Sequence, residues 1–352
     1  MIKVLITEDS PVVRGYLKHI LDNDPDIQVV GTAKDGEEAV RMAPVSKPDV
    51  ITMDIHMPKM DGFEATRKIM ETSPIPIVIV SASWNPEEVD KTFRTMEAGA
   101  VAALEKPRGM GHPDSASSVK ELIQTVKLMS DVKVVRRWSP KGKADRGEKL
   151  KTEPIEESLR KDLDIQIVAI GASTGGPVVL QRILSGLPTQ FKVPVVIVQH
   201  IAPGFLPGLS DWLSKTTNFS VTIAKKGEKL KPGMAYLAPD GFQMAIDSKF
   251  HIQLDEEAPE YHLCPSVSYL FRSCARVYGK RAVGVLLTGM GKDGAKELKM
   301  MNDKGAITIA QDKESSVIHG MPGEAIKLGA ASYVLSTDQI SEKLIELVPV
   351  DL

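Results

Sequence analysis

Residues 167–177 read IVAIGASTGGP, and this stretch decides how the second half of the chain is interpreted. A run of apolar residues passes directly into small residues that include three glycines. This pattern is typical of a buried parallel strand that leads into a helix N-terminus, where backbone N–H groups often bind anions. The turn could therefore hold a phosphate, present a serine nucleophile or serve only as a tight connection.

The phosphate interpretation needs residues that the sequence does not supply. The dinucleotide-binding motif G-x-G-x-x-G has a glycine where this chain has Ser173, and an acidic residue follows it about 20 residues later. Here the next predicted strand ends in Gln199 and His200, and the turn has no P-loop lysine. The residues match G-x-S-x-G instead, the pattern of a serine nucleophile on a strand-to-helix turn. A serine that only caps the helix is the alternative.

Two other predicted strands end in residues that could act with Ser173. His200 follows one of them, and Asp293 follows another within the segment TGMGKDG. The carboxyl ends of parallel strands meet at one edge of a sheet, so the three side chains are expected to lie together. A histidine base oriented by an aspartate would complete a catalytic triad, and the glycines around Met290 would free its backbone N–H to bind an oxyanion. The order serine, histidine, aspartate differs from that of the α/β-hydrolase fold and predicts another scaffold.

The N-terminal part of the chain places polar residues at the ends of four predicted strands. Glu8 and Asp9 follow the first strand, and Asp54 follows the third. Such carboxylates repel one another unless a cation joins them, and Mg²⁺ prefers oxygen ligands. Ser81 and Lys106 end the next two strands, where a hydroxyl and an ammonium group could contact a phosphoryl group on a carboxylate. For any one of these positions, an ordinary solvated loop residue is the alternative.

Alternation of short apolar runs with amphipathic segments predicts two doubly wound α/β domains with parallel sheets. Strands are expected at 2–6, 28–31, 50–53, 75–81, 101–104, 165–170, 193–199, 220–223, 234–237, 282–287, 306–310 and 332–335. Helices are expected at 12–21, 36–43, 87–98, 117–130, 177–186, 208–216, 266–278, 293–304 and 322–328. The highly charged segment between the two halves predicts a linker, so we place the domains at 1–127 and 164–352 and the linker at 128–163.

The composition argues against several classes of protein. With 42% hydrophobic residues, 26% charged residues and a net charge of −2, nothing predicts nucleic-acid or membrane binding. Two cysteines, Cys264 and Cys274, do not make a disulfide framework and fit a reducing compartment. No leader peptide and no apolar run of about 20 residues is evident, so we expect a cytoplasmic protein. His251, His262 and His319 lack the spacing of zinc ligands, so no zinc is expected.

The N-terminal motifs resemble those of the two-component response-regulator receiver family. The resemblance extends over residues 1 to about 125. The motifs that carry it are ED at 8–9, MDIHMPKMDG at 53–62, VSA at 80–82 and EKP at 105–107.

This resemblance implies a flavodoxin-like fold and phosphorylation of Asp54 by a histidine kinase. It also implies an Mg²⁺ ion bound by Asp9, Asp54 and the backbone carbonyl of His56, with Glu8 assisting through water. Ala103 departs from the family, which often has an aromatic switch residue at that position.

The C-terminal motifs IGASTGGP, VQHIAPGF, TGMGKDG and IAQDKESSVIHGMPGEAI resemble the chemotaxis methylesterase family. These are receiver-controlled protein-glutamate methylesterases, and the order of the two parts is the same here. The resemblance covers residues 165 to about 350 and implies a Rossmann-like catalytic domain without a cofactor. The implied reaction is hydrolysis of glutamate γ-methyl esters on the cytoplasmic helices of methyl-accepting chemoreceptors, often with deamidation of receptor glutamines.

The resemblance also implies how the residues act. Ser173 would form an acyl-enzyme with the glutamyl group and release methanol or ammonia. His200 would act as base and then as acid, with Asp293 orienting it. The backbone N–H of Met290, aided by Thr174, would hold the oxyanion.

Some residues depart from the methylesterase pattern. The family usually has His-Arg before P-S-V and an aspartate after it, where this chain has Leu263, Cys264 and Ser268. These changes motivate two alternatives: a receiver-controlled binding protein of a non-chemotaxis pathway, with an altered or lost esterase substrate, and a serine esterase for small molecules.

A linker joins the predicted phosphorylation site at Asp54 to the predicted esterase site at Ser173, which suggests that the first site controls the second. We hypothesise that the unphosphorylated receiver packs over the Ser173 cleft and excludes the receptor helix. A phosphoryl group on Asp54 adds roughly two negative charges and would move the domains apart.

Overall fold

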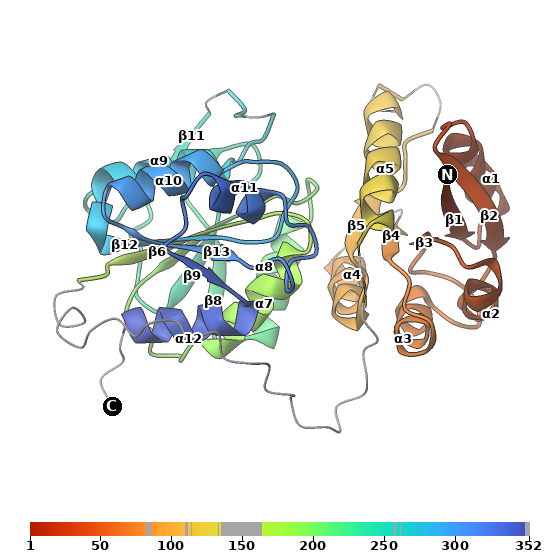
Figure 1. The fold of residues 1–352 in the computed structure, drawn as a ribbon, viewed down its shortest axis with the longest axis horizontal. Coiled ribbons are helices and arrows are strands. Elements are labelled where there is room, and N and C mark those ends of the chain that lie inside the picture. Colours follow the sequence, from red (N-terminus) through yellow and green to blue (C-terminus); the bar gives the residue numbers. More distant parts are fainter. Residues whose placement is uncertain are drawn as a thin grey trace. The chain divides into compact units, whose positions relative to one another are not determined.

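The computed structural model divides the 352-residue chain into two compact units, residues 1–137 and 138–352, which are described separately (Figure 1). It describes residues 1–81, 86–109, 112–113, 115–132, 134, 164–256, 258–260 and 262–348. The expected linker at 128–163 lies largely outside these ranges, so its limits stay predictions. No helix in the described ranges is long and apolar enough to cross a membrane.

The first unit is a parallel five-stranded sheet in the order β2-β1-β3-β4-β5. Its strands have the bounds β1 Ile2–Thr7, β2 Ile27–Ala33, β3 Val50–Met53, β4 Ile77–Ser81 and β5 Ala102–Glu105. Every residue of β3 and β4 is buried, which explains the continuous apolar runs VITM and IVIV. The strand order reverses beside β1, and ligands of doubly wound sheets bind at the carboxyl ends of the strands at such a point.

Helices α1 Pro11–Asp22, α2 Gly36–Ser46, α3 Gly62–Thr72, α4 Pro86–Ala98 and α5 Ser115–Ser130 complete the first unit. The sequence analysis missed α3. Its buried face includes Thr66 as well as Ala65 and Ile69, which weakens the apolar periodicity. A capping signal was present, because the side chain of Asp61 accepts a hydrogen bond from the N–H of Glu64.

The second unit is a parallel seven-stranded sheet in the order β14-β13-β12-β6-β7-β9-β8. Its strands have the bounds β6 Ile167–Ala172, β7 Val195–Gln199, β8 Ser220–Ile223, β9 Met234–Leu237, β12 Ala282–Leu286, β13 Ile307–Gln311 and β14 Tyr333–Leu335. The central strand β6 pairs with both β7 and β12, and the order reverses around it. The stretch IVAIGASTGGP thus begins on the strand at the switch point of the sheet.

Helices cover both faces of this sheet. Figure 1 shows α9, α10 and α11 on one face and α7, α8 and α12 on the other. Their bounds are α7 Gly176–Gly186, α8 Leu206–Thr216, α9 Val267–Val277, α10 Ala295–Asp303, α11 Met321–Lys327 and α12 Thr337–Leu347. The expectation of two doubly wound parallel-sheet domains is confirmed.

An antiparallel hairpin was not expected from the sequence. Its strands β10 (Gln243–Ile246) and β11 (Ile252–Asp255) have four residues each and join neither parallel sheet. The hairpin packs against α9, where Met244 and Ile246 bury their side chains in the same apolar core as Leu270 and Phe271. It therefore supports the helix whose N-terminus contributes to the site described below.

Candidate active site

Ser173 lies on a sharp turn between β6 and α7. Its backbone N–H donates to the carbonyl of Thr288 (3.0 Å), and its own carbonyl accepts from the N–H of Gly176 (2.8 Å). Helix α7 begins at Gly176 after Gly175, whose φ of +80° is in the left-handed region that glycine adopts without strain. The predicted strand–serine–helix turn is present at these residues.

The turn packs closely against the loop after β12. A Cβ atom added to Gly289 would lie 2.6 Å from the Cβ of Ser173, which is closer than two non-bonded carbon atoms can approach. The hydroxyl of Thr288 donates to the carbonyl of Thr174 (3.0 Å), so a hydrogen bond also joins the same two segments. The glycine and the threonine together bring the nucleophile turn next to Met290.

Two backbone N–H groups near the turn are available to a substrate. In the described part of the chain, the N–H groups of Thr174 and Met290 donate to no protein acceptor. Met290 is 50% exposed and, with Gly291 and Lys292, forms an exposed stretch between the buried residues Gly289 and Asp293. The two predicted oxyanion donors therefore both have free N–H groups on loops that contact each other.

His200 and Asp293 meet at the same edge of the sheet. The N–H of His200 donates to the carbonyl of Ala172 (2.9 Å), so the histidine lies beside the end of β6. Its Nε2 lies 3.0 Å from Oδ2 of Asp293, and the two side chains are 10% and 2% exposed. The contact is short but not aligned as a hydrogen bond.

No hydrogen bond joins the Ser173 hydroxyl to the His200 ring within the described residues. Substrate-free sites often hold catalytic groups further apart or less well aligned than they are in the reacting complex. All three predicted triad residues nonetheless lie at the carboxyl ends of β6, β7 and β12, which are adjacent strands.

The N-terminus of α9 holds the carboxylate of Asp293. Asp293 accepts hydrogen bonds from the hydroxyl of Ser266 (3.2 Å) and from the N–H groups of Val267 (2.7 Å) and Ser268 (3.0 Å). Burial raises the pKa of Asp293, but the contact with His200 and the bonds from Ser268 outweigh it, so the pKa is lowered overall. The carboxylate is therefore charged at neutral pH and can stabilise a protonated His200.

The departures from the methylesterase pattern lie around this helix start. The Ser268 hydroxyl accepts from the N–H of Gly294 (2.9 Å) and donates to Oε2 of Glu297 (2.7 Å). Ser268 thus binds Asp293, the residue that follows it and the first turn of α10. The sequence analysis did not foresee that Ser266 and Ser268 hold Asp293, although a serine before an apolar helix is a recognisable capping signal.

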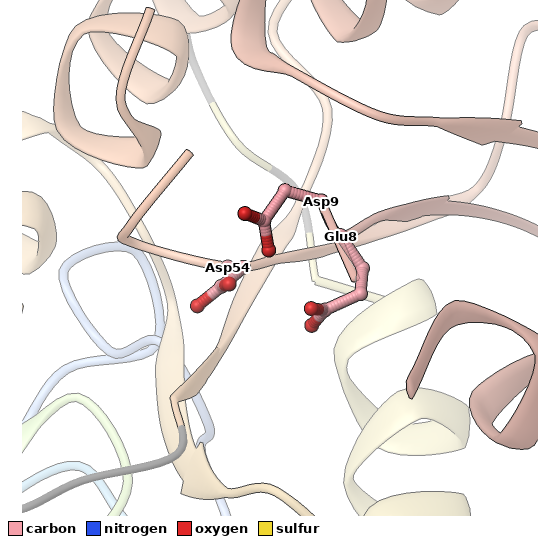
Figure 2. A group of neighbouring side chains, drawn as sticks. All are labelled: Glu8, Asp9 and Asp54. Atoms are coloured by element: carbon pink, nitrogen blue, oxygen red, sulfur yellow. The ribbon is translucent and has the colours of Figure 1, made fainter. Parts of the chain in front are cut away.

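The first unit gathers the predicted carboxylates at the ends of β1 and β3. Carboxylate oxygens of Glu8, Asp9 and Asp54 all lie within 4.8 Å of one another. Figure 2 shows the three side chains converging, with Asp9 the most exposed of the three. Nζ of Lys106 lies 2.8 Å from Oε2 of Glu8 and 2.9 Å from Oδ2 of Asp54. The hydroxyl of Ser81 is buried and has no hydrogen-bond partner among the described residues.

The charges of this cluster are only partly compensated. Burial raises the pKa of Glu8, and the nearby carboxylate of Asp54 raises it further. Burial also raises the pKa of Asp54, and there the second contribution comes from the carboxylate of Asp9. Lys106 lowers both pKa values but does not outweigh these effects. Burial lowers the pKa of Lys106, but its bonds to Glu8 and Asp54 outweigh burial and raise it. Three oxygen ligands crowded in this way fit a hard divalent cation, which would reduce their repulsion. His56 follows at the same strand end, with an exposed side chain.

Comparison with known proteins identifies the family. Residues 168–344 match the family model described as CheB methylesterase, and residues 4–113 match the response regulator receiver domain. The chain belongs to the CheB methylesterase family. The expected combination of a receiver domain with a methylesterase domain is confirmed, as is the expected class of hydrolase.

Relatives match over nearly the whole chain. A protein-glutamate methylesterase/protein-glutamine glutaminase of Syntrophus aciditrophicus (strain SB) is 55% identical over 347 residues, which cover 99% of this chain and 98% of that protein. A protein of the same name from Nitrosospira multiformis is 53% identical over 353 residues, 99% of this chain and 97% of its own. The crystal structure of the Thermotoga maritima CheB methylesterase catalytic domain matches with a TM-score of 0.51 and 41% identity, over 52% of this chain and 99% of that one.

Proposed function

We propose that this chain is a phosphorylation-controlled protein-glutamate methylesterase that hydrolyses γ-methyl esters of chemoreceptor glutamates and deamidates receptor glutamines. The names of the relatives and their identity over nearly the whole chain support the substrate class. The observation that carries the proposal is the position of Ser173, on a tight turn at the sheet edge where His200 meets the buried carboxylate of Asp293.

In the first half-reaction, Oγ of Ser173 attacks the ester carbonyl and its proton passes to His200. Nε2 faces Asp293, so Nδ1 is the ring nitrogen left to accept this proton. The N–H groups of Met290 and Thr174 donate to the oxyanion of the tetrahedral intermediate. The C–O bond to the methoxy group then breaks, and His200 returns the proton, so methanol leaves.

In the second half-reaction, water attacks the glutamyl ester of Ser173. His200 takes a proton from the water and passes it to Oγ of Ser173 as the acyl bond breaks. The products are a glutamate carboxylate and free enzyme. The same steps on a glutamine side chain release ammonia instead of methanol.

In the receiver, Asp54 is the proposed acceptor of a phosphoryl group from a histidine kinase. Asp9, Asp54 and the carbonyl of His56 would hold Mg²⁺, with Glu8 assisting through water. The ion would neutralise charge on the carboxylates and on the incoming phosphoryl group. Lys106 already contacts Oδ2 of Asp54, and the unpartnered hydroxyl of Ser81 is a second group for the phosphoryl oxygens.

Methanol release separates this function from its alternatives. Purified chain is incubated with a chemoreceptor cytoplasmic fragment that carries glutamyl methyl esters and, separately, with the γ-methyl ester of N-acetylglutamate as a small ester that also releases methanol. The proposal expects a kcat/KM for the receptor fragment at least about a hundredfold higher than for the small ester, because binding energy is used in the transition state. Hydrolysis of the small ester alone would favour a small-molecule esterase, and no hydrolysis of either would favour a binding protein.

A further inference from the structure

Three buried glutamines contact the loops of the candidate active site but take no part in the proposed chemistry. Gln199 is 4% exposed, and Gln243 and Gln311 are fully buried. A buried amide costs free energy unless it is hydrogen-bonded, and a site performs best when its loops are held by such partners. We propose that Gln199, Gln243 and Gln311 are positioning residues of the ester-hydrolysis site, each of which holds a different loop; the inference rests on the proposed function.

Gln199 joins the nucleophile to the base. It is the last residue of β7, and its Nε2 donates to the carbonyls of both Ser173 and His200, at 2.8 Å each. Its Oε1 has no hydrogen-bond partner among the described residues and lies against Gly176, where a Cβ atom would come within 2.1 Å of it. One amide group therefore fixes the separation of the two backbones that carry the proton donor and acceptor.

Gln243 holds the helix start that binds Asp293. It is the first residue of β10, and its Oε1 accepts from the N–H of Ser266 (2.9 Å) while its Nε2 donates to the carbonyl of Leu263 (3.2 Å). Ser266 caps α9 and donates its hydroxyl to Asp293. The hairpin that carries Gln243 thus has a role in the site, although none of its residues reaches the reacting atoms.

Gln311 holds the loop that carries Met290, one of the two proposed oxyanion donors. It is the last residue of β13, and its Oε1 accepts from the N–H of Thr288 (2.7 Å). Its Nε2 donates to the carbonyl of Ser315 (2.9 Å). Thr288 lies two residues before Met290 and bonds the carbonyl of Thr174 through its hydroxyl. A shift of Thr288 would therefore move both N–H groups that face the oxyanion.

Neither a carboxylate nor a hydrocarbon could replace these amides. Gln199, Gln243 and Gln311 each donate to at least one backbone carbonyl, which a carboxylate would repel. A hydrocarbon would remove the bonds to the carbonyl of His200 and to the N–H groups of Ser266 and Thr288. Substitution by methionine keeps the length of the side chain and removes the amide. Since a displacement of about 1 Å can reduce catalysis about a hundredfold, small movements of the loops are expected to lower kcat strongly.

The test compares Gln199→Met, Gln243→Met and Gln311→Met in the full chain by methanol release from the methyl-esterified receptor fragment. For each we expect kcat to fall at least about tenfold with KM within about twofold of wild type, because transition-state geometry changes and substrate docking does not. The matched control is Asn302→Leu. Its amide donates to the hydroxyls of Thr308 (3.0 Å) and Ser332 (2.9 Å), and Thr308 lies near the start of β13, away from the strand end that carries Gln311.

Thermal unfolding of all four variants separates positioning from stability. The proposal is overturned if kcat of the glutamine variants stays within about twofold of wild type, or falls no more than in Asn302→Leu at an equal loss of Tm. If wild type releases no methanol, the proposed function fails but the inference is still tested. The readout is then the rate at which a fluorophosphonate labels Ser173, which the inference expects to fall in the glutamine variants and not in Asn302→Leu.

Discussion

The buried carboxylate of Asp293 is stabilised in its charged form by the groups around it. Three donors from the start of α9 and the ring of His200 surround its carboxylate. These contacts outweigh burial and hold the pKa of Asp293 below its usual value of about 3.9, so the carboxylate is charged at neutral pH. It can therefore compensate a positive charge that forms on the neighbouring imidazole during the reaction.

Asp293→Asn removes the charge but keeps the size of the side chain. We expect kcat to fall by about 10³ to 10⁴, because the imidazolium that forms during the reaction loses its compensating charge. Methanol release at pH 7 measures the effect. Asp211→Asn, on an exposed pair with Lys215, is the matched control and should keep wild-type kcat. A loss below about tenfold in Asp293→Asn would remove Asp293 from the proposed triad.

The acidic residues of the receiver predict a response to magnesium. A cation that binds only the folded state raises stability, by about 2.7 kcal/mol at a hundred times its Kd. We expect Mg²⁺ to raise the Tm of the first unit, and Asp9→Asn or Asp54→Asn to reduce that shift. Asp26→Asn, away from the cluster, should leave it intact. An equal shift in all four proteins would place the ion elsewhere.

At the scale of elements, the approach of the loop after β12 to the nucleophile turn is the most sensitive feature. Gly289→Ala would place a methyl group 2.6 Å from the Cβ of Ser173 and 2.4 Å from Sδ of Met321. We expect kcat to fall about a hundredfold because the serine must move. Gly15→Ala in α1 meets no atom within 4 Å and should instead raise the free energy of unfolding by about 0.5–1 kcal/mol. Wild-type kcat in Gly289→Ala would show that the turn tolerates the displacement.

The elements also show what the sequence could and could not predict. Strands buried on both faces, such as Val50–Met53, could be found because their apolar runs are continuous. The expected bounds of this strand, of Met234–Leu237 and of the edge strand Ser220–Ile223 agree residue for residue with the structure. The helix Gly62–Thr72, the hairpin and the last helix were missed, since their apolar residues are few or interrupted by polar ones. The contact of His200 with Asp293 near the Ser173 turn could be predicted because strand ends of a parallel sheet converge.

The residues that support the site could not be found in the same way. The bonds of Gln243 to Leu263 and Ser266, of Ser268 to Asp293 and of Gln311 to Thr288 span 20 to 25 residues of the chain, and no local pattern marks such pairs. Their positions relative to Asp293 and Thr288 are set only when the sheet and α9 pack together.

In the whole chain, we expect the receiver unit to control the rate of the catalytic unit. A small-molecule phosphodonor with Mg²⁺ should raise methanol release by the full chain, and Asp54→Asn should abolish that response. Residues 164–352 alone should be faster than the unphosphorylated full chain and unaffected by the phosphodonor. This fragment corresponds to a domain whose homologue was solved on its own, at 41% identity. Control by the receiver would be refuted if methanol release were equally fast in the full chain with and without the phosphodonor, in Asp54→Asn and in residues 164–352 alone.

Ser173 is the proposed nucleophile of an ester hydrolase, so removal of its hydroxyl should abolish the reaction. Methanol release from the methyl-esterified receptor fragment is compared between wild type and Ser173→Ala, with equal Tm values as evidence that the variant is folded. The account predicts that the alanine variant loses at least about 10³-fold in rate, because no acyl-enzyme can form. A rate within about tenfold of wild type in Ser173→Ala would contradict the proposed mechanism.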